Sequence, residues 1–177
     1  MKRNIKIVSI ILILALLCML SGCEEKKVTP ISEQEFIDFL EQKMNMKNGK
    51  DFHEVEDYAI ETYNGEEAGP TEDWAYVHAI EAQQGDVILV YCMFDTREEA
   101  EASFQVAVQK YEQFKDSKKD RCVYTPGETG YVQKQLSNVW DSWYYFDQTV
   151  IYTCCVGDQG RKTINRFLNE FSYPTLK

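Results

Sequence analysis

Apolar and polar residues change their spacing several times along the chain, and each change marks an expected element. Residues 7–20 form one apolar run that only Ser9 interrupts. Helical spacing of apolar residues predicts helices over about 33–46, from Asp95 to about 115, and from Asp158 to just before Pro174. Alternating or continuous apolar stretches between turn residues predict strands in the intervening segments.

The first two expected helices begin with capping residues. Ser32 and Glu35 have the spacing of a capping box, in which each side chain binds the backbone N–H of the other. Asp95 and Thr96 each have a glutamate three residues later, so either residue can cap the second helix. The apolar stripe expected on that helix is Ala100, Phe104, Ala107, Tyr111 and Phe114.

Two hairpins are expected, at 74–94 with its turn at 83–85 and at 140–156 with its turn at Asp147-Gln148. Residues 87–94 are apolar throughout, which indicates a strand that is central and covered on both faces, or one covered by a helix on one face and by a partner on the other. Residues 51–63 are compatible with a strand or a short helix, and we interpret them as a strand. Further short strands are expected at 121–125 and 130–136, and residues 64–73 are expected to form a loop.

Both hairpins precede an expected helix, and a shift of 63 residues aligns Cys92 with Cys155 and Phe104 with Phe167. Few identities support this alignment, so either two similar hairpin–helix halves or a chance match explains it. In both cases the expected fold class is α+β, with about three helices packed on an antiparallel sheet.

The first residues have the organisation of an export signal. Basic residues precede the apolar run, which is shorter than the about 17–25 residues of a membrane-spanning helix. Leu20-Ser21-Gly22-Cys23 follows at once. This segment resembles the lipobox of bacterial lipoproteins, and the resemblance covers the signal segment and Cys23 only.

The resemblance implies that residues 1–22 are removed and that Cys23 receives a diacylglyceryl group, which anchors the protein on the extracytoplasmic face of the cell membrane. Two acyl chains hold a protein stably where one is marginal, because each buried CH₂ contributes about 0.8 kcal/mol. The expected organisation is a signal peptide at 1–22, a lipidated tether at 23–31 and one globular domain at 32–177. An ordinary secretory signal and an uncleaved anchor are the alternatives.

Charge narrows the range of partners. The whole chain has a net charge of −10, and removal of the three basic residues of segment 1–22 leaves −13. This charge argues against nucleic acid and against electrostatic docking on anionic lipid. Twelve acidic residues and no lysine or arginine lie between Lys50 and Arg97. This acidic half is either a surface for a cation or a basic partner, or a solvated face, and we interpret it as a solvated face.

The sequence contains no nucleophile elbow, phosphate loop or zinc motif, so we expect neither an enzyme nor a cofactor or metal site. The only histidines are His53 and His78. Because His78 and Cys92 lie on paired strands of the first hairpin, a small enzyme that uses this pair or paired carboxylates is an alternative.

Four cysteines lie beyond Cys23, and two of them are adjacent in one expected strand. Cys154 and Cys155 should therefore point to opposite faces, so they cannot share a partner site. We expect at most one disulfide bond, and if one exists, Cys122 is one end of it.

Aromatic residues are concentrated at 140–146, where Trp143 and Tyr145 share one face of the expected strand. If that face is exposed, Trp140, Trp143 and Tyr145 form a binding surface, and the alternative is burial in the core. We therefore predict a non-enzymatic, membrane-tethered domain that binds a protein or glycan of the cell envelope. A receptor subunit for a small molecule is a further alternative, and the oligomeric state stays open.

Overall fold

A single antiparallel sheet of seven strands organises the protein. The computed structural model describes residues 28–64, 72–113 and 120–177. The strand order is β1-β2-β3-β7-β6-β5-β4, and each strand is antiparallel to its neighbours. The strands are β1 (Phe52–Tyr63), β2 (Glu72–Gln84), β3 (Val87–Met93), β4 (Arg121–Tyr124), β5 (Thr129–Leu136), β6 (Val139–Phe146) and β7 (Thr149–Val156).

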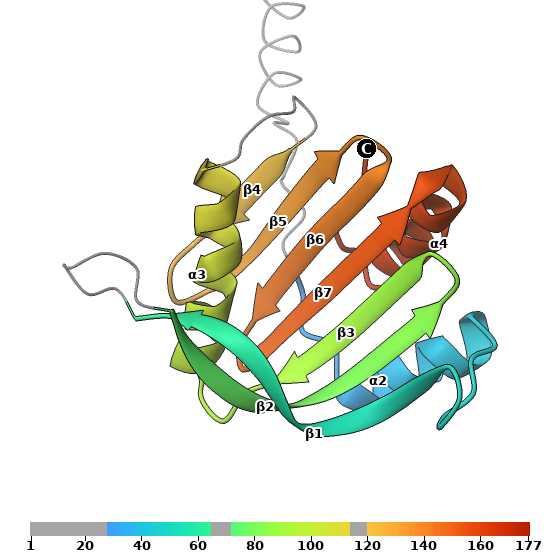
Figure 1. Ribbon diagram of the computed structural model, residues 1–177, viewed down its shortest axis with the longest axis horizontal. Coiled ribbons are helices and arrows are strands. Elements are labelled where there is room, and N and C mark those ends of the chain that lie inside the picture. The colour runs from blue at the N-terminus through green and yellow to red at the C-terminus, as the bar shows by residue number, and fades with distance from the viewer. Residues whose placement is uncertain (1–27, 65–71, 114–119) are drawn as a thin grey trace, which may run out of the picture.

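Helices cover both faces of this sheet. They are α2 (Glu33–Asp38), which continues as the π-helical turn η1 (Phe39–Lys43), α3 (Arg97–Gln113) and α4 (Gly157–Glu170). In Figure 1, α3 lies in front of the sheet, whereas α2 and α4 lie behind it. The buried residues form two clusters accordingly, one with α2 and α4 and one with α3. The expected α+β class is confirmed.

The predicted strands and helix starts agree with the structure. Residues 52–63 form a strand, and both hairpins are present. Ser32 and Glu35 form the capping box, and Thr96 rather than Asp95 caps α3, since the Glu99 N–H donates to its Oγ1. The first helix ends at Lys43 and not near 46, because Asn45 adopts a left-handed conformation with a φ of 56°. The expected end of α3 near 115, including Phe114, lies outside the described residues.

The two hairpin–helix units have the same order of elements, but their helices cover opposite faces. Cys92 and Phe104 belong to the α3 cluster, whereas the aligned Cys155 and Phe167 belong to the cluster of α2 and α4. β3 and β7 pair in the middle of the sheet, so the units meet there. Residues that the 63-residue shift aligns therefore point to opposite sides of the sheet.

A bulge in β1 shapes the α3 side of the molecule. The register between β1 and β2 shifts between Val55 and Tyr58, and Asp57 has a φ of 57°. A bulge bends its strand and increases the local twist. In Figure 1 the β1–β2 hairpin curves round to α3, and the two elements are in contact. Tyr58 and Ile60, which follow the bulge, consequently pack against the α3 cluster.

The segment at 28–31 belongs to the globular domain and not to a free tether. Val28 is 4 % exposed and Ile31 is 6 % exposed, and both lie in the cluster of α2 and α4. The Tyr173 hydroxyl donates to the Thr29 carbonyl at 2.7 Å, and the Tyr91 hydroxyl donates to the Ile31 carbonyl at 3.2 Å. The domain therefore begins by residue 28, four residues before the predicted boundary at 32.

Candidate binding site

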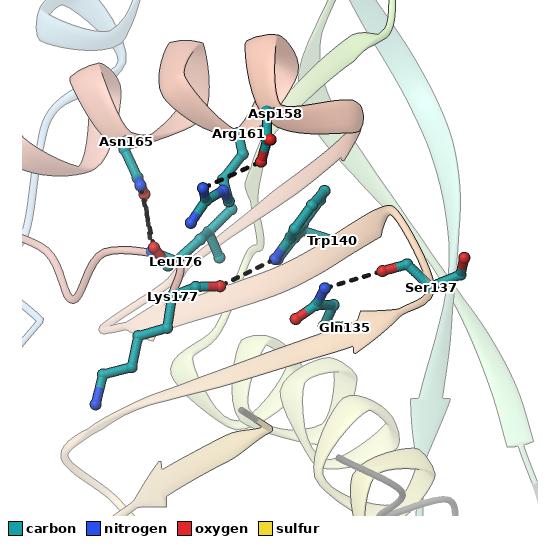
Figure 2. A network of polar contacts seen from close by, with 8 residues as sticks. All are labelled: Gln135, Ser137, Trp140, Asp158, Arg161, Asn165, Leu176 and Lys177. Atoms are coloured by element: carbon teal, nitrogen blue, oxygen red, sulfur yellow. Dashed lines mark hydrogen bonds and ion pairs between the residues drawn. The ribbon is translucent and has the colours of Figure 1, made fainter. Parts of the chain in front are cut away.

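Trp140 is buried on the α4 side of β6, where it holds the last residues of the chain. Its Nε1 donates to the Lys177 carbonyl at 3.2 Å, and the Arg161 guanidinium lies 5.4 Å from its ring centroid. Figure 2 shows this arrangement, with Arg161 also paired to Asp158 at 3.1 Å. Trp140 is 6 % exposed. It therefore contributes to the core and not to a binding surface.

Tyr145 is buried under α3. Its ring stacks on Phe104 with centroids 5.5 Å apart, and its hydroxyl accepts a hydrogen bond from Arg97 Nε at 3.3 Å. Burial raises the pKa of Tyr145, so its hydroxyl stays protonated at neutral pH. Trp143 and Tyr145 do share one face of the strand, as predicted, but of the predicted surface only Trp143 is partly exposed. The predicted surface of Trp140, Trp143 and Tyr145 is therefore wrong.

An apolar pocket of about 200 Å³ lies beside Trp143 on the α3 side of the sheet. Strands β3, β6 and β7 form its floor, while β1 and α3 form its walls. The bulge in β1 brings one wall into place. The lining residues are Tyr58, Ile60, Val90, Cys92, Ser103, Trp143, Val150 and Tyr152.

Two aromatic rings on neighbouring strands dominate the floor. Trp143 and Tyr152 are direct partners across β6 and β7, and their ring centroids are 5.2 Å apart. The Tyr152 hydroxyl donates to Asp141 Oδ1 at 3.0 Å. Burial and the charge of Asp141 raise the pKa of Tyr152, which keeps this hydroxyl protonated and able to donate.

A second carboxylate acts on the pocket from β2. Glu81 is the register partner of Val90, and its charge contributes to the raised pKa values of Tyr58 and Cys92, in which burial is the larger cause. Burial and Glu81 together raise the pKa of Cys92 to about 12. Cys92 is therefore a neutral thiol at physiological pH and a poor nucleophile.

His78 and Cys92 do not form a pair. The strand register places His78 opposite Met93 and Ala79 opposite Cys92, so the two side chains point to opposite faces of the sheet. His78 Nε2 lies 3.6 Å from Glu33 Oε2 on the α2 side. The structure therefore contradicts the proposed Cys92/His78 catalytic pair.

Cys122 is not an end of a disulfide bond in the structure. Cys92, Cys122, Cys154 and Cys155 are all present as thiols and not as disulfides. Cys154 is partly exposed on the α3 side, whereas Cys155 is buried on the α4 side, as strand alternation predicts. Among the described residues, no group of three or more His, Cys, Asp or Glu side chains is placed to hold a metal ion.

Two exposed aromatic residues were not singled out by the sequence pattern. Trp74 is 58 % exposed and Tyr76 is 67 % exposed, and both lie on the part of β2 that pairs with β1 but extends past β3. Their alternation with apolar neighbours is the same as that of core residues, so the sequence pattern does not indicate that these two side chains are exposed.

Two hollows are larger than the pocket beside Trp143, at about 340 Å³ and 460 Å³, and they are lined mainly by polar and charged residues.

The lining of the pocket beside Trp143 is mainly apolar and aromatic. The described residues that line it include no histidine, lysine, arginine or carboxylate, and its one thiol is neutral.

Within the described part of the chain, none of the helices is both long enough and apolar enough to cross a membrane. No protein-family model, no curated protein and no solved structure matches this chain.

Proposed function

We propose that this protein is a lipid-anchored, extracytoplasmic binding protein that holds a small ligand in the pocket beside Trp143. The observation that carries the proposal is the concave apolar pocket with aromatic residues from three strands. Small-molecule sites are concave and mainly apolar, and they contain a few polar groups that orient the ligand. At about 200 Å³ this pocket lies below the usual range of about 300–1,000 Å³, so the ligand is compact.

The packing of residues 28–31 supports a close attachment to the membrane. Five peptide steps separate Cys23 from the buried Val28, which is at most about 18 Å when fully extended. Val28 and Ile31 lie on the side of α2 and α4, whereas the pocket lies on the opposite side of the sheet. A lipid on Cys23 therefore holds the domain near the membrane and leaves the pocket accessible.

The anchor is tested by replacing Cys23. We expect the wild-type chain to incorporate a labelled fatty acid in growing cells and to sediment with membranes. Cys23→Ala should abolish the label, because the acceptor thiol is lost, whereas Cys122→Ala should keep it. Undiminished labelling of Cys23→Ala would show that this residue is not the lipid attachment site.

The pocket is tested with a neutral probe, 3,3-dimethyl-1-butanol, and the full chain in dodecyl maltoside micelles. Saturation-transfer NMR should detect binding above the signal of empty micelles. Trp143→Ala should weaken binding because it removes a large aromatic ring from the floor of the pocket. Trp74→Ala makes the same change on the exposed part of β2 and should leave binding unchanged. Equal signals from both variants and from empty micelles would contradict the proposal.

A further inference from the structure

We infer that the ligand of this pocket is an organic cation with an alkylated ammonium group, an inference that rests on the binding function proposed above. Three features of the pocket support this ligand class: the aromatic rings, the two nearby carboxylates and the scarcity of hydrogen-bond acceptors in the lining.

Aromatic rings from three strands line the pocket. Tyr58 comes from β1, Trp143 from β6 and Tyr152 from β7. The face of an aromatic ring is negative, so tryptophan and tyrosine attract cations that lie over them. Because the Tyr152 hydroxyl donates to Asp141, electron density moves toward the ring and strengthens this attraction.

Carboxylates lie on two sides of the pocket. Asp141 lies 3.0 Å from the Tyr152 hydroxyl on the β6 side. Glu81 lies on the β2 side, opposite Val90 in register, and its charge acts on both Tyr58 and Cys92. Neither carboxylate lines the pocket, so both act on a bound cation through their field and not as direct ligands.

Three of the basic residues near this side, Lys110, Lys134 and His53, are placed away from the lining. Lys110 of α3 forms an ion pair with Glu61 of β1 at 2.6 Å. Lys134 is the register partner of Asp141, and its Nζ lies 3.4 Å from the Lys110 carbonyl. His53, the register partner of Glu81, is exposed. None of these three residues lines the pocket, so a bound cation meets no positive charge there.

The scarcity of hydrogen-bond acceptors distinguishes an alkylated ammonium group from a primary one. A primary ammonium has three N–H donors, and a buried donor without a partner is costly. The polar side-chain atoms of the lining residues are the hydroxyls of Ser103 and the two tyrosines, one thiol, and the indole nitrogen of Trp143, which donates and does not accept. A quaternary ammonium has no N–H group, so aromatic faces and methyl contacts satisfy it.

The test compares choline with 3,3-dimethyl-1-butanol, its uncharged analogue of the same shape, on the full chain in dodecyl maltoside micelles. We expect choline to bind about tenfold more tightly, because only choline gains the cation–π and charge interactions. Asp141→Asn and Glu81→Gln should each reduce this ratio and leave the affinity for the alcohol unchanged. Glu41→Gln, which removes the same charge from the exposed side of η1, should leave the ratio unchanged.

The outcomes separate this inference from the binding function itself. Equal affinities for choline and the alcohol, or binding of the alcohol alone, would overturn the cationic ligand and leave the pocket as a binding site. Absence of binding by both probes would overturn both proposals. A choline preference that persists unchanged in Asp141→Asn and Glu81→Gln would overturn the role assigned to the carboxylates.

Discussion

The two faces of the sheet are built from the same strands but are covered to different extents. On one face, two helices and the segments at 28–31 and 173–177 enclose the core, and Phe167 and Tyr144 are completely buried. On the other face, α3 is the one covering helix among the described residues; Phe104 and Tyr145 are buried there, whereas Trp143 and Tyr152 stay partly exposed. In Figure 1, α3 lies in front of the sheet, and α2 and α4 lie behind it.

This difference shows that the covering helices and segments decide which aromatic side chains of the sheet are exposed. The alternation of residues along a strand does not decide it. Trp143 and Tyr145 occupy equivalent positions on β6, yet one lines a pocket and the other lies under α3. Apolar surface that stays partly open forgoes part of the stabilisation that burial provides, about 25 cal/mol per Å². Such surface in a concave site is typical of ligand binding.

The largest expected effect is the difference in reactivity between two adjacent cysteines. Cys154 lies on the partly open face with a pKa of about 11, whereas Cys155 lies in the closed core with a pKa of about 12, both raised mainly by burial. We expect iodoacetamide to modify Cys154 about a hundredfold faster at pH 8.5, because Cys155 requires opening of the core. Tandem mass spectrometry of the native chain measures both rates. Similar rates would show that the two faces are equally open.

Cysteine-to-alanine variants assign this reactivity. In Cys155→Ala, iodoacetamide should still label quickly the peptide that contains residues 154 and 155. In Cys154→Ala, this fast labelling should be lost.

The next largest effect concerns two large aromatic side chains. Phe167 is fully buried and its ring contacts Phe36, Phe39 and Tyr173, so Phe167→Ala should lower the free energy of unfolding by about 3–5 kcal/mol. Trp143→Ala removes a partly exposed ring and should cost less than half of that. Denaturant unfolding followed by circular dichroism measures both, and comparable losses would contradict the distinction between the faces.

The smallest effect is a loss of stability at alkaline pH that both faces should share. Burial is the main cause that raises the pKa of both Cys92 and Cys155 from 9.0 to about 12. Below pH 9 both thiols are neutral in the folded and unfolded chains, so this stabilisation is complete. As the pH rises from 9 to 11 mainly the unfolded thiol ionises, and stability falls by about 2.7 kcal/mol per thiol by pH 11.

Variants identify the contribution of each thiol to this pH dependence. Cys92→Ala and Cys155→Ala should each make the loss of stability between pH 8 and pH 11 smaller. Val90→Ala leaves a comparable space in the same core without removing a titrating group, so it should keep the wild-type pH dependence. A dependence that both cysteine variants leave unchanged would mean that these thiols are accessible to water.

Local features of the fold were predictable because they depend on neighbouring residues. The capping box of Ser32 and Glu35 and the turn at Asp147-Gln148 require only residues within a few positions of each other. The opposite orientations of Cys154 and Cys155 follow from the alternation of a strand. The central position of β3 follows from its uninterrupted apolar run.

The candidate site was only partly predictable, because its parts come from segments far apart in the chain. Trp143 was identified, but Tyr58 and Tyr152 were not, since nothing in their local pattern distinguishes them from core residues. The predicted Cys92/His78 pair was wrong because the strand register places His78 opposite Met93 and not opposite Cys92. The two side chains therefore point to opposite faces of the sheet.

The sequence by itself determined the class of fold and most of its elements, because caps, turns and apolar periodicity act over short distances. It also supplied the lipobox-like segment ending at Cys23, from which the predicted anchor derives. Only the tertiary structure decided which helix covers which face and where the bulged β1 closes against α3. Long-range packing sets these features, so the pocket beside Trp143 became visible only in the folded protein.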